Sequence, residues 1–279
     1  MNDPRDALEA IGQLPDVEID LADAALQLAR IDAPDADWRL ARAELSELAR
    51  GAVEVAGQLD GDLAERAAAL TGLIAGRHRF KGDAETYEDP ANANMIRVME
   101  RRCGLPVALG ILWLHCARAA GWAAHGVDFP SHFLVALDGP TLPGALQQTV
   151  LDPFAGGATL DARALRALLK RVGGEHAELR PGVLQPMSAR SVLLRLQNNV
   201  KVRRLRAGEL QAALACTEDM LRIAPDAAAL WRETALMNQS LGRIAAALLC
   251  FERFLHLVPD GEAAARARVV VGELRARLN

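Results

Sequence analysis

The sequence predicts an α+β protein that is mostly helical, with a small sheet in its middle part and an all-α helical repeat at its end. Three observations support this fold class. Ala, Leu and Arg are abundant while aromatic residues make up only 4% of the 279 residues, a mixture that favours helix over sheet. Short runs rich in Val, Phe and Leu gather between residues 122 and 160. The last third repeats itself at intervals of about 34 residues.

Composition and charge argue against several classes of protein. A formal net charge of −4 gives no bulk attraction to nucleic acid, and the basic run at 201–206 spreads around a predicted helix as a solvated face. The first residues show no signal segment and no apolar run is long enough to cross a bilayer, so we expect a cytoplasmic protein without a membrane partner. The four cysteines form no C-x-x-C pair, so we expect reduced thiols and neither metal nor cofactor.

The first 79 residues are predicted to form successive helices that lead into a core. Apolar residues recur every three to four positions from residue 4 onward, as on one face of a helix. Pro34 and Asp35 mark a break between two of these helices. Residues 80–90 are expected to form a structured loop, because Gly, Asp and Pro are mixed there with two aromatic residues that can anchor it.

The core itself is predicted over residues 80–183. A helix of about 92–101 precedes a second helix from Pro106 to Ala120, which is apolar on nearly all sides and is therefore expected to be buried. Pro106 suits the first turn of that helix, where no backbone amide is lost. The pattern then changes to short apolar runs bounded by Gly, Pro and Asp, which predict three or four strands.

Residues 184–279 are predicted to form a short array of tetratricopeptide (TPR) repeats. The period of about 34 residues brings a Gly at the helix turn, small residues in the second helix and a Pro after it. The matching pairs are Gly208 and Gly242, Ala213 and Ala247, Cys216 and Cys250, and Pro225 and Pro259. We expect two repeats, at about 194–227 and 228–261, and a capping helix. Because two repeats rarely bury enough surface alone, we also expect the array to dock on the preceding domain.

Eleven residues of the predicted core carry a resemblance to a known superfamily. They are Asn92, Val98, Arg102, Gly104, Pro106, Pro130, His132, Phe133, Asp152, Pro153 and Gly157. Over roughly residues 10–180 the chain resembles the SirB1-type branch of the transglutaminase-like superfamily, in which a TPR tail is also usual. The resemblance implies a papain-related core with a small antiparallel sheet, in which the N-terminus of a helix presents a Cys to a His and an Asp of that sheet.

The expected nucleophile is the main departure from that pattern. The resemblance places the catalytic Cys about fifteen residues before Gly121, and this sequence has Pro106 there. Proline cannot attack an acyl group, so covalent acyl transfer by the superfamily's mechanism is not expected. The resemblance therefore implies a bacterial-type pseudoenzyme that keeps His132 and Asp152 as vestiges. Asn92, Arg102 and Pro106 are expected to line the former cleft.

Alternatives remain open at this level. Cys103 lies three residues before Pro106 and could act with His132 and Asp152 in a cysteine hydrolase or acyltransferase, although the offset takes the thiol out of near-contact geometry. His132 could simply hold the sheet together, and Asp152 could be a turn residue before Pro153. The leading prediction is a non-catalytic protein whose TPR groove binds a protein or peptide partner in interaction or regulation. The old cleft could also bind a small molecule without chemistry.

Overall fold

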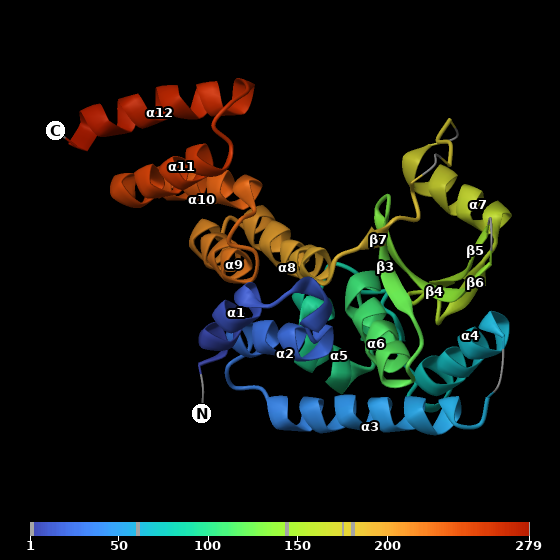
Figure 1. Cartoon of the computed structure of the whole chain (residues 1–279). Helices are drawn as coiled ribbons and strands as arrows, with labels where there is room; N and C mark the ends of the chain where they lie inside the picture. Colours follow the sequence, from blue (N-terminus) through green and yellow to red (C-terminus); the bar gives the residue numbers. More distant parts are fainter. Residues whose placement is uncertain (1–2, 60–61, 143–144, 175, 180–181, 279) are drawn as a thin grey trace. The chain divides into compact units, whose positions relative to one another are not determined.

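Helices make up most of the chain, and a five-stranded antiparallel sheet lies among them, as the sequence predicts (Figure 1). The computed structural model describes residues 3–59, 62–142, 145–174, 176–179 and 182–278. The chain divides into two units. One unit, residues 15–196, contains the sheet and is called the core unit here. The other, residues 1–14 and 197–279, is helical and is called the repeat unit.

Five helices of the core unit begin where a short polar side chain caps them. An Asp or Asn immediately before each of five helices accepts a hydrogen bond from an amide of the first turn, which offsets the unpaired amides of a helix N-terminus. These helices are α2 (Leu21–Asp32), α3 (Trp38–Ala56), α4 (Leu63–Thr71), α5 (Met95–Arg101) and α7 (Ala162–Gly173). Shorter turns are η1 (Asp16–Glu18), η2 (Gly72–Arg77) and η3 (Pro90–Ala93).

The sheet has the strand order β6-β5-β4-β3-β7, with every neighbouring pair antiparallel. The strands are β3 (Ala124–Phe129), β4 (His132–Leu142), β5 (Ala145–Asp152), β6 (Ala158–Leu160) and β7 (Pro186–Met187). Successive residues of β4 face opposite sides. Leu134 packs with Leu169 of α7 on one side, while Phe133 lies against Gly110 on the other. Helices therefore cover both faces of the sheet (Figure 1).

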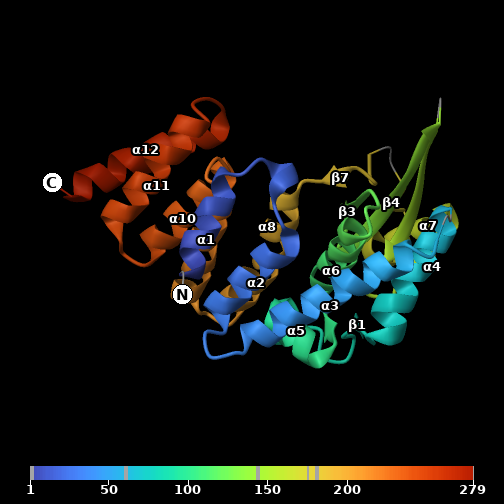
Figure 2. The same ribbon diagram turned by 60° about the horizontal axis from the view of Figure 1, so that its bottom comes forward.

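The helix α6 (Pro106–Ala119) is buried inside the core unit, as its all-round apolar sequence predicts. It packs against α2 and α3 and against β3 and β4 (Figure 2). Trp113 is fully buried in this helix. Gly110 is required at the crossing with the sheet, because a Cβ there would lie 2.3 Å from Cε1 of Phe133.

A second sheet, made of two short strands, comes before α6 in the chain. The strands β1 (Lys81–Gly82) and β2 (Cys103–Gly104) are parallel, and Lys81 pairs with Cys103. The amide of Gly82 also donates to the carbonyl of Phe154, 3.1 Å away, which ties this pair to the turn after β5. Cys103 therefore lies in a strand before α6 and not within the first turn of the helix.

The repeat unit follows the predicted period of about 34 residues. Its helices are α1 (Pro4–Gln13), the later part of α8 (Ala189–Arg206), α9 (Leu210–Ile223), α10 (Ala228–Ser240), α11 (Ile244–Leu257) and α12 (Glu262–Leu278). Gly208 and Gly242 occupy equivalent turns with φ of +77° and +73°. Glycine is favoured at both turns because other side chains rarely adopt this left-handed backbone.

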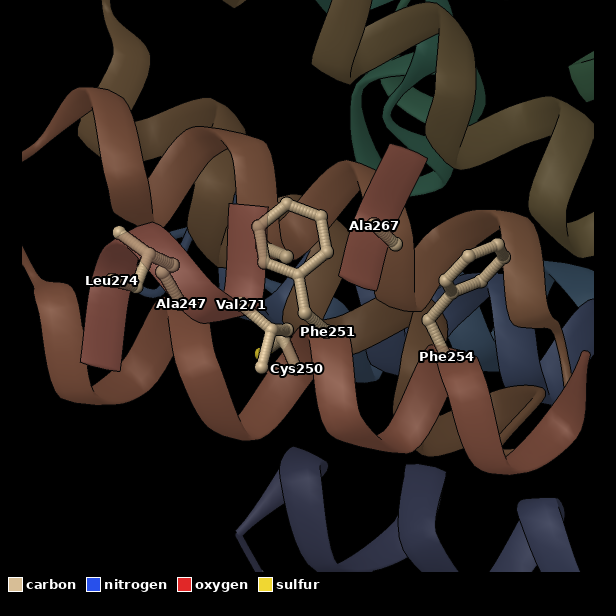
Figure 3. Packing of buried hydrophobic residues seen from close by; sticks show 8 residues of the cluster. Ala247, Cys250, Phe251, Phe254, Ala267, Val271 and Leu274 are labelled. Carbon is tan, nitrogen blue, oxygen red and sulfur yellow. The ribbon is translucent and has the colours of Figure 1, made fainter. Parts of the chain in front are cut away.

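The last helix covers the apolar face of the second repeat. Phe251 and Phe254 of α11 pack with Val271 and Leu274 of α12 in one cluster of buried residues (Figure 3). The helix α12 lies at the place in the chain where the sequence predicts a capping helix, and its role as a cap stays a prediction.

The N-terminal helix belongs to the repeat unit and not to the helical lead-in of the core, which the sequence placed at residues 1–79. Nε of Arg5 donates to Oδ1 of the buried Asp219 at 3.1 Å. Gly12 lies so close to α9 that a Cβ would meet the carbonyl oxygen of Arg222 at 2.1 Å. An amphipathic pattern predicts that α1 has an apolar face, but it does not predict which element packs against that face. For this reason the predicted place of α1 differs from the one in the structure.

The core unit also extends beyond the boundary predicted after residue 183. Met187 and Pro186 pair with β3 as the fifth strand of the sheet. The carboxylate of Asp16 then accepts the amides of Ala189 and Arg190, at 2.7 and 3.0 Å, at the start of α8. The division between the two units falls within α8, after Leu196. Pro186 is the first residue of this short edge strand, where a missing amide is tolerated.

Candidate functional site

His132 and Asp152 lie side by side at the ends of two neighbouring strands. His132 is the first residue of β4 and Asp152 the last of β5, and Nε2 of the ring lies 2.9 Å from Oδ1 of the carboxylate. The same oxygen accepts the amides of Phe154 and Ala155, at 2.9 and 3.2 Å. Asp152 therefore orients the imidazole and also shapes the turn after β5.

Nδ1, the other ring nitrogen of His132, is available for a proton transfer or for a hydrogen bond to a ligand. Because Asp152 accepts a hydrogen bond at Nε2, the neutral ring carries its proton there and keeps a lone pair on Nδ1. Within the described part of the chain, no protein hydrogen bond reaches Nδ1. The side chains of His132 and Asp152 are only 13% and 11% exposed. Such a pair can act as a general base in catalysis only if a nucleophile lies beside it to give up a proton.

Aromatic and basic groups hold the His132 segment in place. The ring of Phe154 meets the imidazole edge to face at 6.2 Å, and Tyr87 packs on Phe154 at 5.8 Å. Arg195 donates to the carbonyl of His132 at 2.5 Å and forms an ion pair with Asp128. Burial lowers the pKa of the Arg195 guanidinium. The start of β4 is thus fixed from several directions.

Cys103 does not have the electrostatics of an activated thiol. Burial raises the pKa of this cysteine, against the smaller, opposing influence of Arg101. A cysteine nucleophile requires the opposite shift, because the thiolate is the reactive form. Cys116, Cys216 and Cys250 are buried more deeply, and burial raises the pKa of Cys116 to about 12.

Pro106 occupies the first position of α6 and is itself buried. The residue before it, Leu105, caps the helix without a side-chain hydrogen bond, and its amide donates to the carbonyl of Asn92 at 2.9 Å. The position at which the resemblance implies a thiol therefore holds a saturated ring with no proton to give and no electron pair to donate.

Asn92 and Arg102, which the sequence places along the cleft, have partners within the fold. Asn92 is fully buried and donates to the carbonyl of Thr86 at 2.7 Å. Arg102 donates to Glu44 of α3 at 2.7 Å and lies over the ring of Phe80. These contacts give both residues a structural role in the fold. That they also line a cleft open to a ligand stays a prediction.

A buried acidic residue that the sequence analysis did not single out anchors the loop before α5. The hydroxyl and the amide of Thr86 donate to Asp83 and hold the pKa of this carboxyl at about 2, below its usual value. Arg101 adds an ion pair at 2.9 Å and also donates to Asn92 at 3.1 Å. The spacing of Asp and Thr three residues apart is typical of a side-chain-to-backbone turn and could have revealed this anchor.

Two features commonly used to assign function are not found in the described residues. No three His, Cys, Asp or Glu side chains gather there as a metal site. Among the helices described, none has both the length and the apolar composition needed for a membrane crossing.

The repeat unit contains a cavity of about 850 Å³ that involves the N-terminal helix. Its walls come from α1, α9, α10 and α11 and combine apolar with charged side chains. The lining residues are Glu9, Gln13, Glu218, Leu221, Arg222, Pro225, Trp231, Thr234, Asn238, Ala246, Leu249, Cys250 and Arg253. Leu249 is 68% exposed, which is unusual for a large apolar side chain in a cavity wall.

Comparison with known proteins agrees with both units. The family model described as "Transglutaminase-like superfamily" matches residues 41–198, and a tetratricopeptide-repeat model matches residues 200–272. The chain belongs to the transglutaminase-like superfamily. The recognition of such a domain followed by TPR repeats is thereby confirmed, while the narrower SirB1-type assignment stays a prediction.

Relatives of this transglutaminase-like protein occur in bacteria and in mammals. A UPF0162 protein of Xylella fastidiosa strain 9a5c is 30% identical over 247 residues, which cover 84% of this chain and 82% of the relative. A UPF0162 protein of Vibrio cholerae is 30% identical over 223 residues, covering 80% of each chain. F-box only protein 21 of Mus musculus is 28% identical over 136 residues, covering 47% of this chain and 21% of the relative. No solved structure matches the chain.

The structure of this superfamily member brings together two of the three residues proposed for a triad. His132 and Asp152 form a hydrogen bond, whereas Cys103 lies in β2 with a raised pKa. Sequence reasoning missed the contribution of α1 to the repeat cavity. It also missed a second His–Asp pair, because residues 13 positions apart on neighbouring strands leave no local motif.

Proposed function

We propose that this transglutaminase-like protein acts without covalent catalysis and binds a protein or peptide partner through its repeat unit. The observation that carries the proposal is Pro106 at the first turn of α6, where the resemblance implies a catalytic cysteine. Cys103, in the preceding strand β2, has a raised pKa and therefore lacks the activation that a nucleophile needs. His132 and Asp152 remain bonded, but Asp152 also holds the turn after β5, which gives a reason for its retention without chemistry.

The cavity of the repeat unit supports the binding part of the proposal. TPR arrays present extended surfaces that suit peptides and helices of partner proteins. Here Leu249 and Trp231 contribute apolar surface to the lining, and Glu218 and Arg253 contribute charges of both signs. A groove of mixed character can select a partner segment by both shape and charge.

The enzymatic alternative relies on Cys103 and can be tested by thiol chemistry. Alkylation of Cys103 by iodoacetamide, followed by peptide mass spectrometry across pH, should show a thiol that reacts no more readily at neutral pH than a free cysteine. A thiol that is already ionised near pH 6 would support the cysteine hydrolase or acyltransferase reading instead.

The binding proposal is tested by a matched pair of variants. The Leu249→Glu variant puts a charge into the cavity wall, whereas Val269→Glu makes the same change at an exposed site of α12, where the valine is 63% exposed. Affinity capture from a bacterial extract should lose its specific proteins with Leu249→Glu and keep them with Val269→Glu. Equal capture by the two variants would contradict a role for this groove. A cytoplasmic location stays a prediction and is not needed for this test.

A further inference from the structure

The helix α7 presents only positive charge on its exposed side. It lies against one face of the sheet, where Leu165 and Leu169 are buried in a cluster with the strands (Figure 1). Every charged residue of the helix is basic, and all of them are exposed. These four residues, called the basic stripe here, are Arg163, Arg166, Lys170 and Arg171.

The basic stripe has no partner inside the protein. Within the described part of the chain, none of its four side chains takes part in an ion pair or a hydrogen bond. Like charges three or four positions apart repel each other on a helix. Arg163 also lies in the first turn, where the helix dipole favours a negative charge and where no acidic residue is present. The stripe therefore costs α7 stability, and a partner of opposite charge would offset that cost.

The sign of the stripe is opposite to that of the chain as a whole, whose formal net charge is −4. A local positive surface on a negative protein steers an acidic partner to this one helix and not to the molecule at large. Three of the four side chains are arginines, whose planar guanidinium groups pair with carboxylates through two parallel hydrogen bonds. The stripe thus matches an acidic ligand in both charge and geometry.

Among acidic ligands, a protein segment fits the stripe better than a nucleic acid or a membrane. The stripe is about 12 Å long, at about 1.5 Å per helical residue, so it reaches few phosphates, and the negative remainder of the chain repels a polyanion. A helix that binds a membrane surface inserts its apolar face, whereas Leu165 and Leu169 are buried against the sheet. A short peptide segment with carboxylates spaced along it requires neither a longer basic surface nor a free apolar face.

We propose that the exposed face of α7 docks an acidic segment of a partner protein. Carboxylates of that segment pair with the basic stripe, while the leucines of α7 keep the helix on the sheet. The contacts are exposed ion pairs, so the interaction is sensitive to salt and contributes more to the choice and capture of a partner than to tight binding. This surface belongs to the core unit, and the proposal does not depend on the repeat groove or on the His132–Asp152 pair.

The proposal is tested on the full chain with a fluorescein-labelled peptide of about twelve residues in which glutamate and alanine alternate. A neutral peptide with glutamine in place of glutamate is the control. Fluorescence anisotropy at low salt should show saturable binding of the acidic peptide, at least roughly tenfold tighter than that of the neutral one. Raising NaCl from about 50 to about 300 mM should weaken binding roughly tenfold, because exposed ion pairs are screened.

Matched variants locate the binding on α7. Arg163→Glu combined with Arg166→Glu should weaken binding of the acidic peptide at least roughly tenfold. Arg42→Glu combined with Arg232→Glu changes the net charge equally at exposed sites of α3 and α10, and it should leave binding within about twofold. The α7 variant should unfold in urea at the same or a higher concentration, because it puts carboxylates near the helix N-terminus and four residues before Lys170.

A loss of binding without a loss of stability is the signature of a docking surface. If the reversal at Arg163 and Arg166 lowered the urea midpoint, Lys170→Gln combined with Arg171→Gln would carry the same test, since glutamine is a good helix former. Equal binding by the α7 and control variants, or equal affinity for the acidic and neutral peptides, would overturn the proposal. So would tighter binding of a single-stranded oligonucleotide or of phosphatidylserine vesicles through the same four residues, because the ligand class would then be different.

Discussion

At the scale of single residues, Pro106 and Asp152 both have structural roles that require no chemistry. Pro106 fits the first turn of α6, where its missing amide costs nothing. Asp152 accepts three hydrogen bonds at one oxygen, and two of them belong to the turn after β5. Removing Asp152 would therefore disturb the fold even in a protein without activity, so the His–Asp pair by itself is no evidence of catalysis.

The first prediction concerns a thiol placed at the start of α6. In a Cys103→Ser background, the Pro106→Cys variant should carry a thiol whose pKa lies at least about one unit below that of a free cysteine, because the helix N-terminus and His132 favour the thiolate. The pH dependence of alkylation by iodoacetamide measures this shift. Adding His132→Ala should reverse most of it. If the introduced thiol instead had an ordinary pKa, the retained pair would not be aligned with the start of the helix.

The second prediction concerns Asp83 and acid stability. The carboxyl of Asp83 has a folded pKa of about 2, below its usual value of 3.8, chiefly because Thr86 donates to it. Its contribution to stability is therefore present above the unfolded pKa and is lost as pH falls from about 4 towards 2. The free energy of unfolding, measured by urea titration, should fall less steeply over this range in Asp83→Asn than in the unaltered protein. Parallel pH curves would contradict this assignment.

At the scale of elements, the packing of α6 on the sheet limits which residues the helix tolerates. Gly110→Ala should destabilise the protein by about 1–3 kcal/mol, because the added methyl group collides with Phe133 and outweighs the gain in helix propensity. Gly272→Ala on α12 is the matched control, since nothing lies within 4 Å of its Cβ position, and it should stabilise by about 0.5–1 kcal/mol. Urea unfolding measures both. A loss at Gly272 as large as that at Gly110 would contradict the packing argument.

The elements that were predicted correctly are those whose own sequence is periodic. The buried helix α6 follows from its all-round apolar composition, and the equivalent turns at Gly208 and Gly242 follow from the repeat. Two-residue strands such as β1, β2 and β7 are too short to show a period. Their pairing depends on the segments that lie beside them. For that reason the sequence did not predict that Cys103 lies in a strand paired with Lys81.

For the whole molecule, the membership of α1 is the feature that the sequence could not reveal. Arg5 and Asp219 are 214 positions apart, and neither belongs to a motif. The local pattern of α1 predicts a helix correctly, but a charge pair at such separation depends on the complete fold. The repeat unit is therefore discontinuous in sequence, and one wall of its cavity comes from the N-terminal helix.

The last prediction tests this discontinuous unit through its buried carboxylate. Burial raises the pKa of Asp219, and Arg5 and Arg222 oppose that rise. Arg5→Gln should destabilise the protein by about 1–3 kcal/mol at neutral pH, because the buried Asp219 loses one of the two ion pairs described for it and keeps the one with Arg222. Glu9→Gln removes the ion pair that Glu9, an exposed residue of the same helix, makes with Arg222, and it should cost less than about 1 kcal/mol.

The pH dependence of this variant distinguishes the lost ion pair from a general weakening of α1. Without Arg5 the pKa of Asp219 should rise further, so the folded state takes up a proton at a higher pH than the unfolded chain does. A group with a raised folded pKa adds stability as pH falls through that value, and the deficit of Arg5→Gln should therefore shrink between pH 7 and about pH 4. Urea titrations at both pH values measure it. A deficit that stays constant would mean that Arg5 acts by packing alone.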